Sequence, residues 1–202
     1  MIAEAVADLR KQLGIPVEPS RRGPTPLRRF FEEMGTPQLS HVALPDLTRG
    51  AVSMHLLSEG ILAGDLGDPE ERLAGFLFFA SGSAWAYVSN DRENPLARRR
   101  FTAAHELGHA VLHRDRMGRF RADVQIVDGT EEGIEEIERE ANRFAAELLM
   151  PAEVIRAREQ ELTREHGACP RSVLEYRLAA ELLVSQQAIR FRLKSLNIGQ
   201  TE

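Results

Sequence analysis

The chain has 202 residues and a net charge of −5 at pH 7. This length corresponds to one domain with at most a small appendage, and it can form a hydrophobic core without disulfides or a structural metal. The acidic balance provides no general attraction to nucleic acid or anionic lipid. The single Cys169 cannot form an internal disulfide, and Glu4 and Asp8 stand where a signal peptide would be basic or apolar. We therefore expect a cytoplasmic protein.

The first half of the sequence predicts two helices followed by short strands. Amphipathic patterns indicate helices at 3–13 and 26–34, separated by the loop-forming stretch GIPVEPSRRGPTP. Short segments rich in Val, Phe, Trp and Tyr then predict strands at residues 41–47, 51–57, 75–79 and 85–89. Ser81, Gly82 and Ser83 form a turn sequence between the last two strands, which should therefore pair as a hairpin.

The second half predicts helices. One helix is expected from Pro95, with Asn94 as its cap, to His113, because its apolar residues recur on one face. A second amphipathic helix is expected from about residue 134 to 150, where a following proline forces its end. Residues 151–202 predict three short helices, so the chain as a whole belongs to the α+β class.

The first of these helices contains the sequence His105-Glu106-Leu107-Gly108-His109. Four residues rotate a helix by about 400°, so His105 and His109 stand one turn apart on the same face. Both imidazoles can then bind one zinc ion at about 2.0–2.1 Å. Glu106 lies about 100° round the helix from His105, which suits a base acting on a metal-activated water. The alternative interpretation is an amphipathic helix with two partly buried histidines.

A catalytic zinc site needs a third protein ligand and one open position for water. The metzincin pattern fails, because it requires glycine and histidine where this chain has Leu112 and Asp115. His113 lies two turns from His105, too far to share its ion. A carboxylate from the second helix is the remaining solution.

The second helix offers two glutamates for this position. Glu138 and Asn142 are four residues apart, so Glu138 could bind zinc while Asn142 accepts a hydrogen bond from a ligand histidine. Glu140 competes, but it lies about 200° round the helix from Glu138, so both cannot point at the metal. Glu138 borders the apolar stripe, which favours it without excluding Glu140. The ligand types suit zinc best, and manganese or cobalt could substitute.

The runs RRRFTAAHELGHAVLH and EREANRFAAELLMP, in this order, resemble the zinc-peptidase family typified by ImmA and IrrE over about residues 75–155. The resemblance implies a minimal gluzincin-like fold: a small twisted sheet, the HExxH helix, a glutamate helix behind it and a helical C-terminal region. It also implies that His105, His109 and Glu138 bind zinc and that Glu106 is the catalytic base.

The same resemblance implies an activity and a partner. It implies a zinc metallo-endopeptidase that makes limited cuts in a cytoplasmic protein, with the predicted hairpin as the substrate-binding edge. Family members with an assigned role typically inactivate a helix-turn-helix repressor of a mobile element or stress regulon, so a repressor encoded nearby is the expected partner. Residues 1–155 would form the metallopeptidase domain, with a helical extension at 1–34, and residues 156–202 a small helical region. The acidic tract 116–137 and the segment 60–72 depart from the pattern in length.

Hydrolysis also needs a hydrogen-bond donor for the oxyanion that forms on the attacked carbonyl. The residue types that could supply this donor occur at four positions, Tyr87, Tyr176, His113 and His166. The sequence does not choose among them.

The segment RLAAELLVSQQAIRFRLKSL, residues 177–196, resembles a helix-turn-helix with Val184 and Ser185 at the turn. The alternative function is therefore a DNA-binding or repressor-binding regulator in which the metal site is structural. Residues 171–202 carry five basic and three acidic residues, a net charge of +2. A DNA-reading surface normally concentrates more positive charge, so we expect packing or repressor docking rather than direct nucleic-acid binding.

Overall fold

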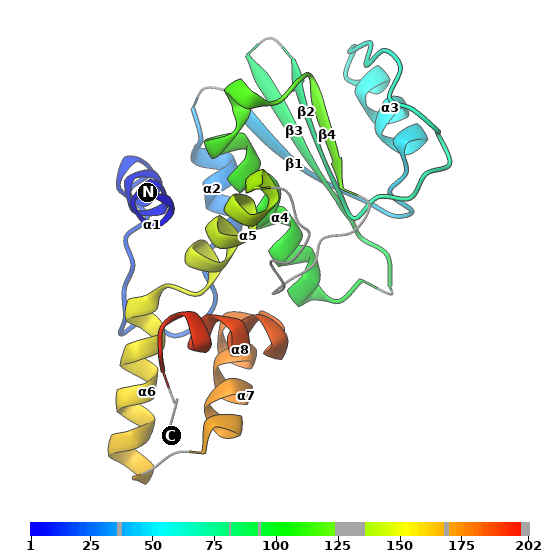
Figure 1. The fold of residues 1–202 in the computed structure, drawn as a ribbon. Coiled ribbons are helices and arrows are strands. Elements are labelled where there is room, and N and C mark those ends of the chain that lie inside the picture. Colours follow the sequence, from blue (N-terminus) through cyan, green and yellow to red (C-terminus); the bar gives the residue numbers. More distant parts are fainter. Residues whose placement is uncertain (36–37, 81, 93, 124–135, 168–169, 199–202) are drawn as a thin grey trace.

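A computed structural model of the chain describes all residues except 36–37, 81, 93, 124–135, 168–169 and 199–202. The described part contains eight α-helices, a short 3-10 helix and four strands, which confirms the predicted α+β class (Figure 1). The elements in chain order are α1 (Ile2–Gln12), α2 (Leu27–Glu33), β1 (Gln38–Leu44), α3 (Arg49–Ser58), β2 (Gly75–Ala80), β3 (Ser83–Ser89), α4 (Leu96–Leu112), η1 (Arg114–Arg116), β4 (Phe120–Asp123), α5 (Glu136–Leu149), α6 (Ala152–His166), α7 (Arg171–Leu182) and α8 (Gln186–Ser195).

The strands form one small mixed sheet in the order β1-β3-β2-β4. β2 and β3 make the expected antiparallel hairpin, β1 runs parallel to β3, and β4 runs antiparallel to β2. Both hairpin strands thus have a neighbour on each side. The expectation that the hairpin is the substrate-binding edge is wrong, because the four-residue strand β4, which the sequence pattern did not reveal, pairs with it.

Strand alternation divides the side chains of β3 between two cores. Ala86 and Val88 belong to the larger core, to which α1, α2 and α4–α8 contribute. Trp85 and Tyr87 face the opposite way, into a smaller core that α3 covers. Figure 1 shows α3 on the side of the sheet away from α4 and α5. The sheet is therefore covered on both faces, and its larger-core face is the one that supports α4.

The strand predicted at 51–57 is wrong, because these residues belong to helix α3. The helix begins with a side-chain cap, in which Oγ1 of Thr48 accepts a hydrogen bond of 3.1 Å from the backbone N–H of Ala51. Its buried residues, Val52 and Leu56, are four positions apart and pack into the smaller core. This spacing is helical, whereas the prediction rested on β-type composition over too short a run.

Two further boundaries differ from the prediction. Strand β1 ends at Leu44, three residues early, and the positive φ of 48° at Asp46 marks the turn that follows it. Helix α4 has Pro95 as its N-cap residue, while the side-chain amide of Asn94 donates a hydrogen bond of 2.9 Å to the carbonyl of Ser89. Asn94 therefore ties the helix to the end of β3 and does not cap it.

Helices α6, α7 and α8 confirm the three short helices expected after the glutamate helix. Figure 1 shows them as a group beyond the end of α5. Arg192 of α8, which is 6% exposed, joins this group to α5: its guanidinium donates to Glu147 at 2.7 and 2.6 Å and to the carbonyl of Met150 at 2.9 Å.

Among the described residues, no helix combines the length and hydropathy needed to cross a membrane. Ser81, Cys169 and the side chain of His166 lie outside the described residues.

Candidate metal centre

Helix α4 presents two histidines toward one point. His105 and His109 are one turn apart and only 1% and 0% exposed, and their Nε2 atoms lie 2.9 Å from each other. If both rings carry their protons on Nδ1, the two facing Nε2 atoms are both acceptors, and a cation between them would satisfy both. The helix therefore brings the two Nε2 atoms together, as the spacing of the motif predicts.

Helix α5 brings Glu138 to the same point. Its Oε2 lies 3.2 Å from Nε2 of His105, and its Oε1 lies 3.2 Å from Nε2 of His109. Ligands around a tetrahedral zinc ion at about 2.0–2.1 Å are about 3.3 Å apart, so these separations match the edges of such a site. Among the described residues, His105, His109 and Glu138 are the group of three that could hold a metal ion. Their donor set suits zinc.

Glu138 is held in its charged form. Burial by itself raises the pKa of this carboxyl, but the adjacent imidazoles of His105 and His109 outweigh burial and hold the pKa well below its usual range. An ionised carboxylate is the form that binds a metal ion.

The outer nitrogen of His105 has the partner that the sequence suggested. Nδ1 of His105 lies 2.9 Å from Oδ1 of Asn142, one helical turn beyond Glu138 on α5. Because an amide oxygen only accepts, this contact places the proton on Nδ1 and leaves Nε2 to face the metal position. Helix α5 thus contacts both nitrogens of His105, Nε2 through Glu138 and Nδ1 through Asn142.

The competing glutamate is directed elsewhere. Oε2 of Glu140 lies 3.0 Å from Nε2 of His113 and 3.0 Å from Nη1 of Arg116. Glu140 is therefore engaged one turn farther along α4 and does not join the cluster of possible ligands.

The proposed base lies against strand β2. Glu106 is fully buried, and an added Cβ at Gly75, the first residue of β2, would overlap its carboxylate. The other residue close to that Cβ would be Thr102, one turn earlier on α4. Glu106 thus lies in the layer between α4 and the sheet, adjacent in sequence to a histidine of the cluster.

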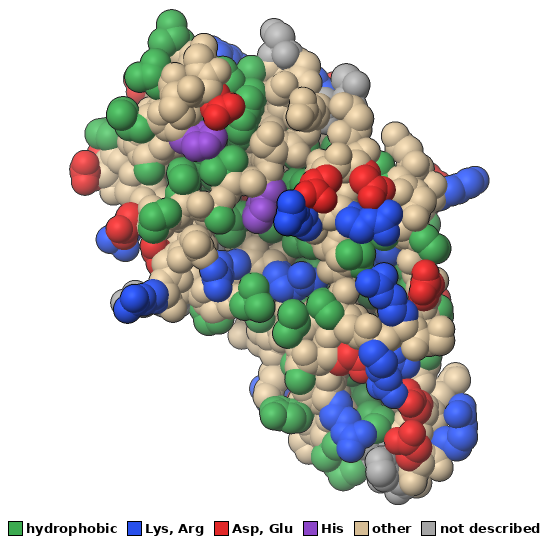
Figure 2. Space-filling view, turned by 180° about the vertical axis from the view of Figure 1, so that it is seen from behind, with side chains coloured by type: hydrophobic (Ala, Val, Ile, Leu, Met, Phe, Trp, Pro, Cys, Tyr) green, Lys and Arg blue, Asp and Glu red, His purple; other side chains and the backbone are tan. Residues whose placement is uncertain are grey.

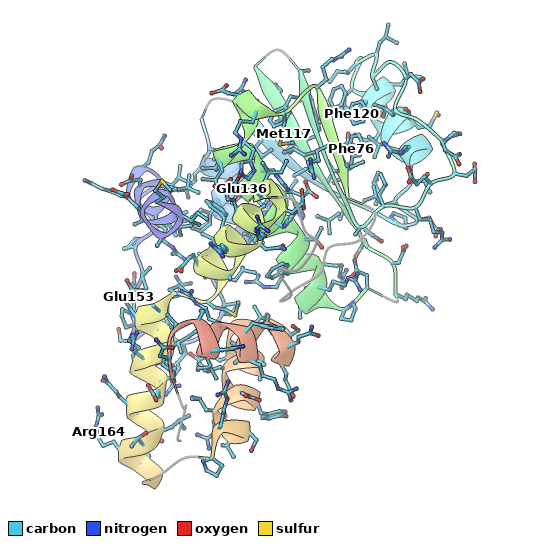
Figure 3. The ribbon with its side chains drawn as sticks, in the orientation of Figure 1. Phe76, Met117, Phe120, Glu136, Glu153 and Arg164 are labelled. Carbon is cyan, nitrogen blue, oxygen red and sulfur yellow. The ribbon has the colours of Figure 1, made fainter. Side chains whose placement is uncertain are left out.

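Strand β4 adds a residue that the sequence analysis missed. Nη2 of Arg121 lies 2.5 Å from Oε1 of Glu138, so a guanidinium stands beside the candidate metal position. The rings of Phe76 and Phe120 stack with their centroids 5.4 Å apart and an interplanar angle of 14° (Figure 3). This contact packs β4, the strand that carries Arg121, against β2. Strand β4 is too short for a periodicity signal, so only the arrangement of the sheet could reveal Arg121.

The structure separates the four possible oxyanion donors. Tyr87 lies on the opposite face of the sheet, where its hydroxyl is 3.1 Å from Nδ1 of His55. Tyr176 is 65% exposed on α7. His113 is buried and engaged with Glu140, and the side chain of His166 is outside the described residues. Tyr87 and Tyr176 are therefore not placed to act at the group formed by His105, His109 and Glu138.

Comparison with known proteins agrees with this geometry. Residues 87–194 match the family described as the IrrE N-terminal-like domain, Peptidase_M78, over slightly more than half of the chain. No curated protein matches the chain significantly. The matched region includes the histidine pair of α4 and the glutamate of α5 as well as the C-terminal helices. The chain belongs to the IrrE N-terminal-like family of metallopeptidases.

Proposed function

We propose that the chain is a zinc-dependent metallo-endopeptidase in which His105, His109 and Glu138 bind the metal and Glu106 is the general base. The observation that supports this most directly is the convergence of two imidazole nitrogens and one carboxylate beside a second, fully buried carboxylate. Manganese or cobalt could replace zinc with the same ligands.

Each side chain then has a defined task. A zinc ion at this position would acidify a water molecule and polarise the carbonyl of the scissile bond. Glu106 accepts the proton that the attacking water loses and later returns it to the leaving amine. The guanidinium of Arg121, beside Glu138, is the candidate donor to the oxyanion, in place of the donors that the sequence suggested.

The Glu106→Gln variant tests this mechanism. Glutamine keeps the shape of the side chain but cannot accept the proton, so the variant should bind zinc with the parent's affinity and lose cleavage by at least about 100-fold. Zinc binding is measured by competition with a chromophoric chelator, and cleavage by mass spectrometry. Equal rates of cleavage by variant and parent would exclude Glu106 as the base.

The proposed substrate is a cytoplasmic helix-turn-helix repressor, cut at one or a few sites. Its support is the resemblance carried by the two motifs, together with the position of β4. Within the described part of the chain β4 has only β2 as a neighbour, so an extended segment of substrate could pair along its outer side. The test is incubation of the zinc-loaded chain with the repressor encoded beside it. Broad cleavage of casein without preference for the repressor would contradict a limited role.

We propose that residues 1–155 act as the peptidase domain and that residues 156–202 support it or dock the substrate. The contacts of α8 weigh against the DNA-binding alternative, because Arg192 is buried against α5 and Arg190 is paired with Glu175 at 2.9 Å. On the face drawn in Figure 2, the lower part of the molecule carries basic and acidic side chains side by side. If the chain shifted DNA in a gel and the shift persisted at moderate salt, the DNA-binding alternative would be restored.

A further inference from the structure

Helix α4 carries a third histidine that continues the row formed by the first two. His113 is one turn beyond His109 and fully buried, and the Nδ1 atoms of the two rings are 2.9 Å apart. The other nitrogen of His113, Nε2, lies 3.0 Å from Oε2 of Glu140. That carboxylate oxygen also lies 3.0 Å from Nη1 of Arg116. A continuous hydrogen-bonded path thus leads from His109 to a charged pair near the surface.

The chemistry of the groups sets the direction of every bond in this path. A neutral imidazole has one N–H and one accepting nitrogen, and a carboxylate only accepts. Glu140 therefore places the proton of His113 on Nε2, which leaves Nδ1 of His113 as an acceptor. The bond between the two histidines then requires the proton of His109 to be on Nδ1. Nε2 of His109 is left without a proton, facing Glu138.

We propose that His113 and Glu140 are positioning residues that hold His109 in the tautomer and ring orientation required of a metal ligand. This inference rests on the proposed metal site and adds to it the means by which the second histidine is oriented. Asn142 serves His105 from helix α5, and His113 serves His109 from helix α4 itself.

The same path gives a role to His113 and Glu140, which lie outside the group of possible metal ligands. His113 is too far along the helix to reach the metal position, and Glu140 points away from it, yet the two contact each other. Arg116 compensates the charge of Glu140, whose side chain is 29% exposed, so the path ends on an ionised carboxylate rather than on a neutral acid. Outer partners of this kind keep a ligand ring from rotating when the metal leaves.

The direct test is the tautomer of His113 in the zinc-loaded parent chain. Long-range ¹H–¹⁵N correlation spectra distinguish the two ring nitrogens of each histidine. We expect the proton of His113 on Nε2 and the proton of His109 on Nδ1. A proton on Nδ1 of His113 would overturn the proposal, whatever the behaviour of any variant.

The variants His113→Phe and Glu140→Gln test the consequence. Removal of an outer partner typically lowers metal affinity by about 10–100-fold, so His113→Phe should lose zinc affinity within this range. Glu140→Gln should lose less zinc affinity, because the amide oxygen of glutamine can still accept the hydrogen bond from Nε2 of His113. The matched control is His55→Phe, which removes a histidine on the other face of the sheet and should leave zinc affinity unchanged. Zinc affinity is measured by chelator competition, and folding by circular dichroism.

The outcomes separate this inference from the function on which it rests. If the parent binds zinc and folded His113→Phe binds it within twofold of the parent, the positioning role is wrong and the metal site stands. If the parent itself binds no zinc, the proposed peptidase function fails as well. If His113→Phe does not fold, the positioning role is tested by the tautomer of His113 in the parent and by the zinc affinity of Glu140→Gln.

Discussion

Gly75 and Glu106 approach so closely that a side chain on Gly75 would overlap the glutamate's carboxylate. The added Cβ would also lie 3.0 Å from Cγ2 of Thr102. The first residue of β2 therefore forms the wall against which the proposed base is packed. A glycine is needed here for space, since a larger residue and the observed position of Glu106 exclude each other.

Gly75→Ala should reduce cleavage by about 100-fold, because the far end of Glu106 can swing away from the added methyl group and a misplacement of about 1 Å is sufficient for such a loss. Zinc affinity should stay close to that of the parent. The control is Gly118→Ala, where an added Cβ has nothing within 4 Å. Measured kcat/KM and zinc stoichiometry test the prediction, and full activity in Gly75→Ala would show that Glu106 does not act from this position.

Glu138→Ala should lower zinc affinity by more than the roughly 10–100-fold expected for an outer partner, because it removes a proposed ligand rather than a group behind one. Glu136→Ala, an exposed change two residues earlier on the same helix, is the control and should have no effect. Chelator competition measures both. Parent-like affinity in Glu138→Ala would remove Glu138 from the site and return Glu140 to consideration.

Tyr87 should resist ionisation until the protein unfolds. Burial, aided by the charge of Glu59, raises its pKa well above that of an ordinary tyrosine. The free energy of unfolding is therefore unaffected by Tyr87 below the ordinary tyrosine pKa of about 10. It falls as the pH rises above that value, because the unfolded chain releases the phenol proton more readily than the folded chain.

The variant Tyr176→Phe leaves Tyr87 as the single tyrosine, since the chain has two. Its phenolate absorbance near 295 nm should appear together with loss of the far-ultraviolet circular dichroism signal. A phenolate band that forms near pH 10 in the folded protein would contradict the burial of Tyr87 beneath α3.

Arg192→Ala should destabilise the attachment of the C-terminal helices to α5. The substitution leaves the carboxylate of Glu147 and the carbonyl of Met150 without this donor, at a cost of about 2–3 kcal/mol. For a chain of this size, Tm should fall by roughly 5–10 °C. Lys194→Ala, an exposed change on the same helix, should change Tm little. Thermal melts followed by circular dichroism compare the two, and equal Tm values would show that this contact does not stabilise the fold.

The agreement between sequence and structure was best where a strong pattern extended over many residues. The helix that carries His105 and His109 was predicted closely, because a long apolar stripe and a flanking proline define it. Short elements are harder to predict from sequence. Residues 51–57 have the composition of a strand but form part of a helix, and strand β4 has no detectable sequence pattern. Pairing with β2 stabilises β4, and this partner is distant in the sequence.

The shared face of His105 and His109 follows from the sequence alone, because 3.6 residues per turn leave no other arrangement of an i, i+4 pair on a helix. Only the packing of α5 against α4 decided that Glu138 meets those histidines while Glu140 meets His113. The periodicity of a helix defines its faces, but it does not say which face of another helix each one will contact. The histidine pair is therefore a local property of α4, whereas its meeting with Glu138 and the contacts of Glu140 are properties of the tertiary structure.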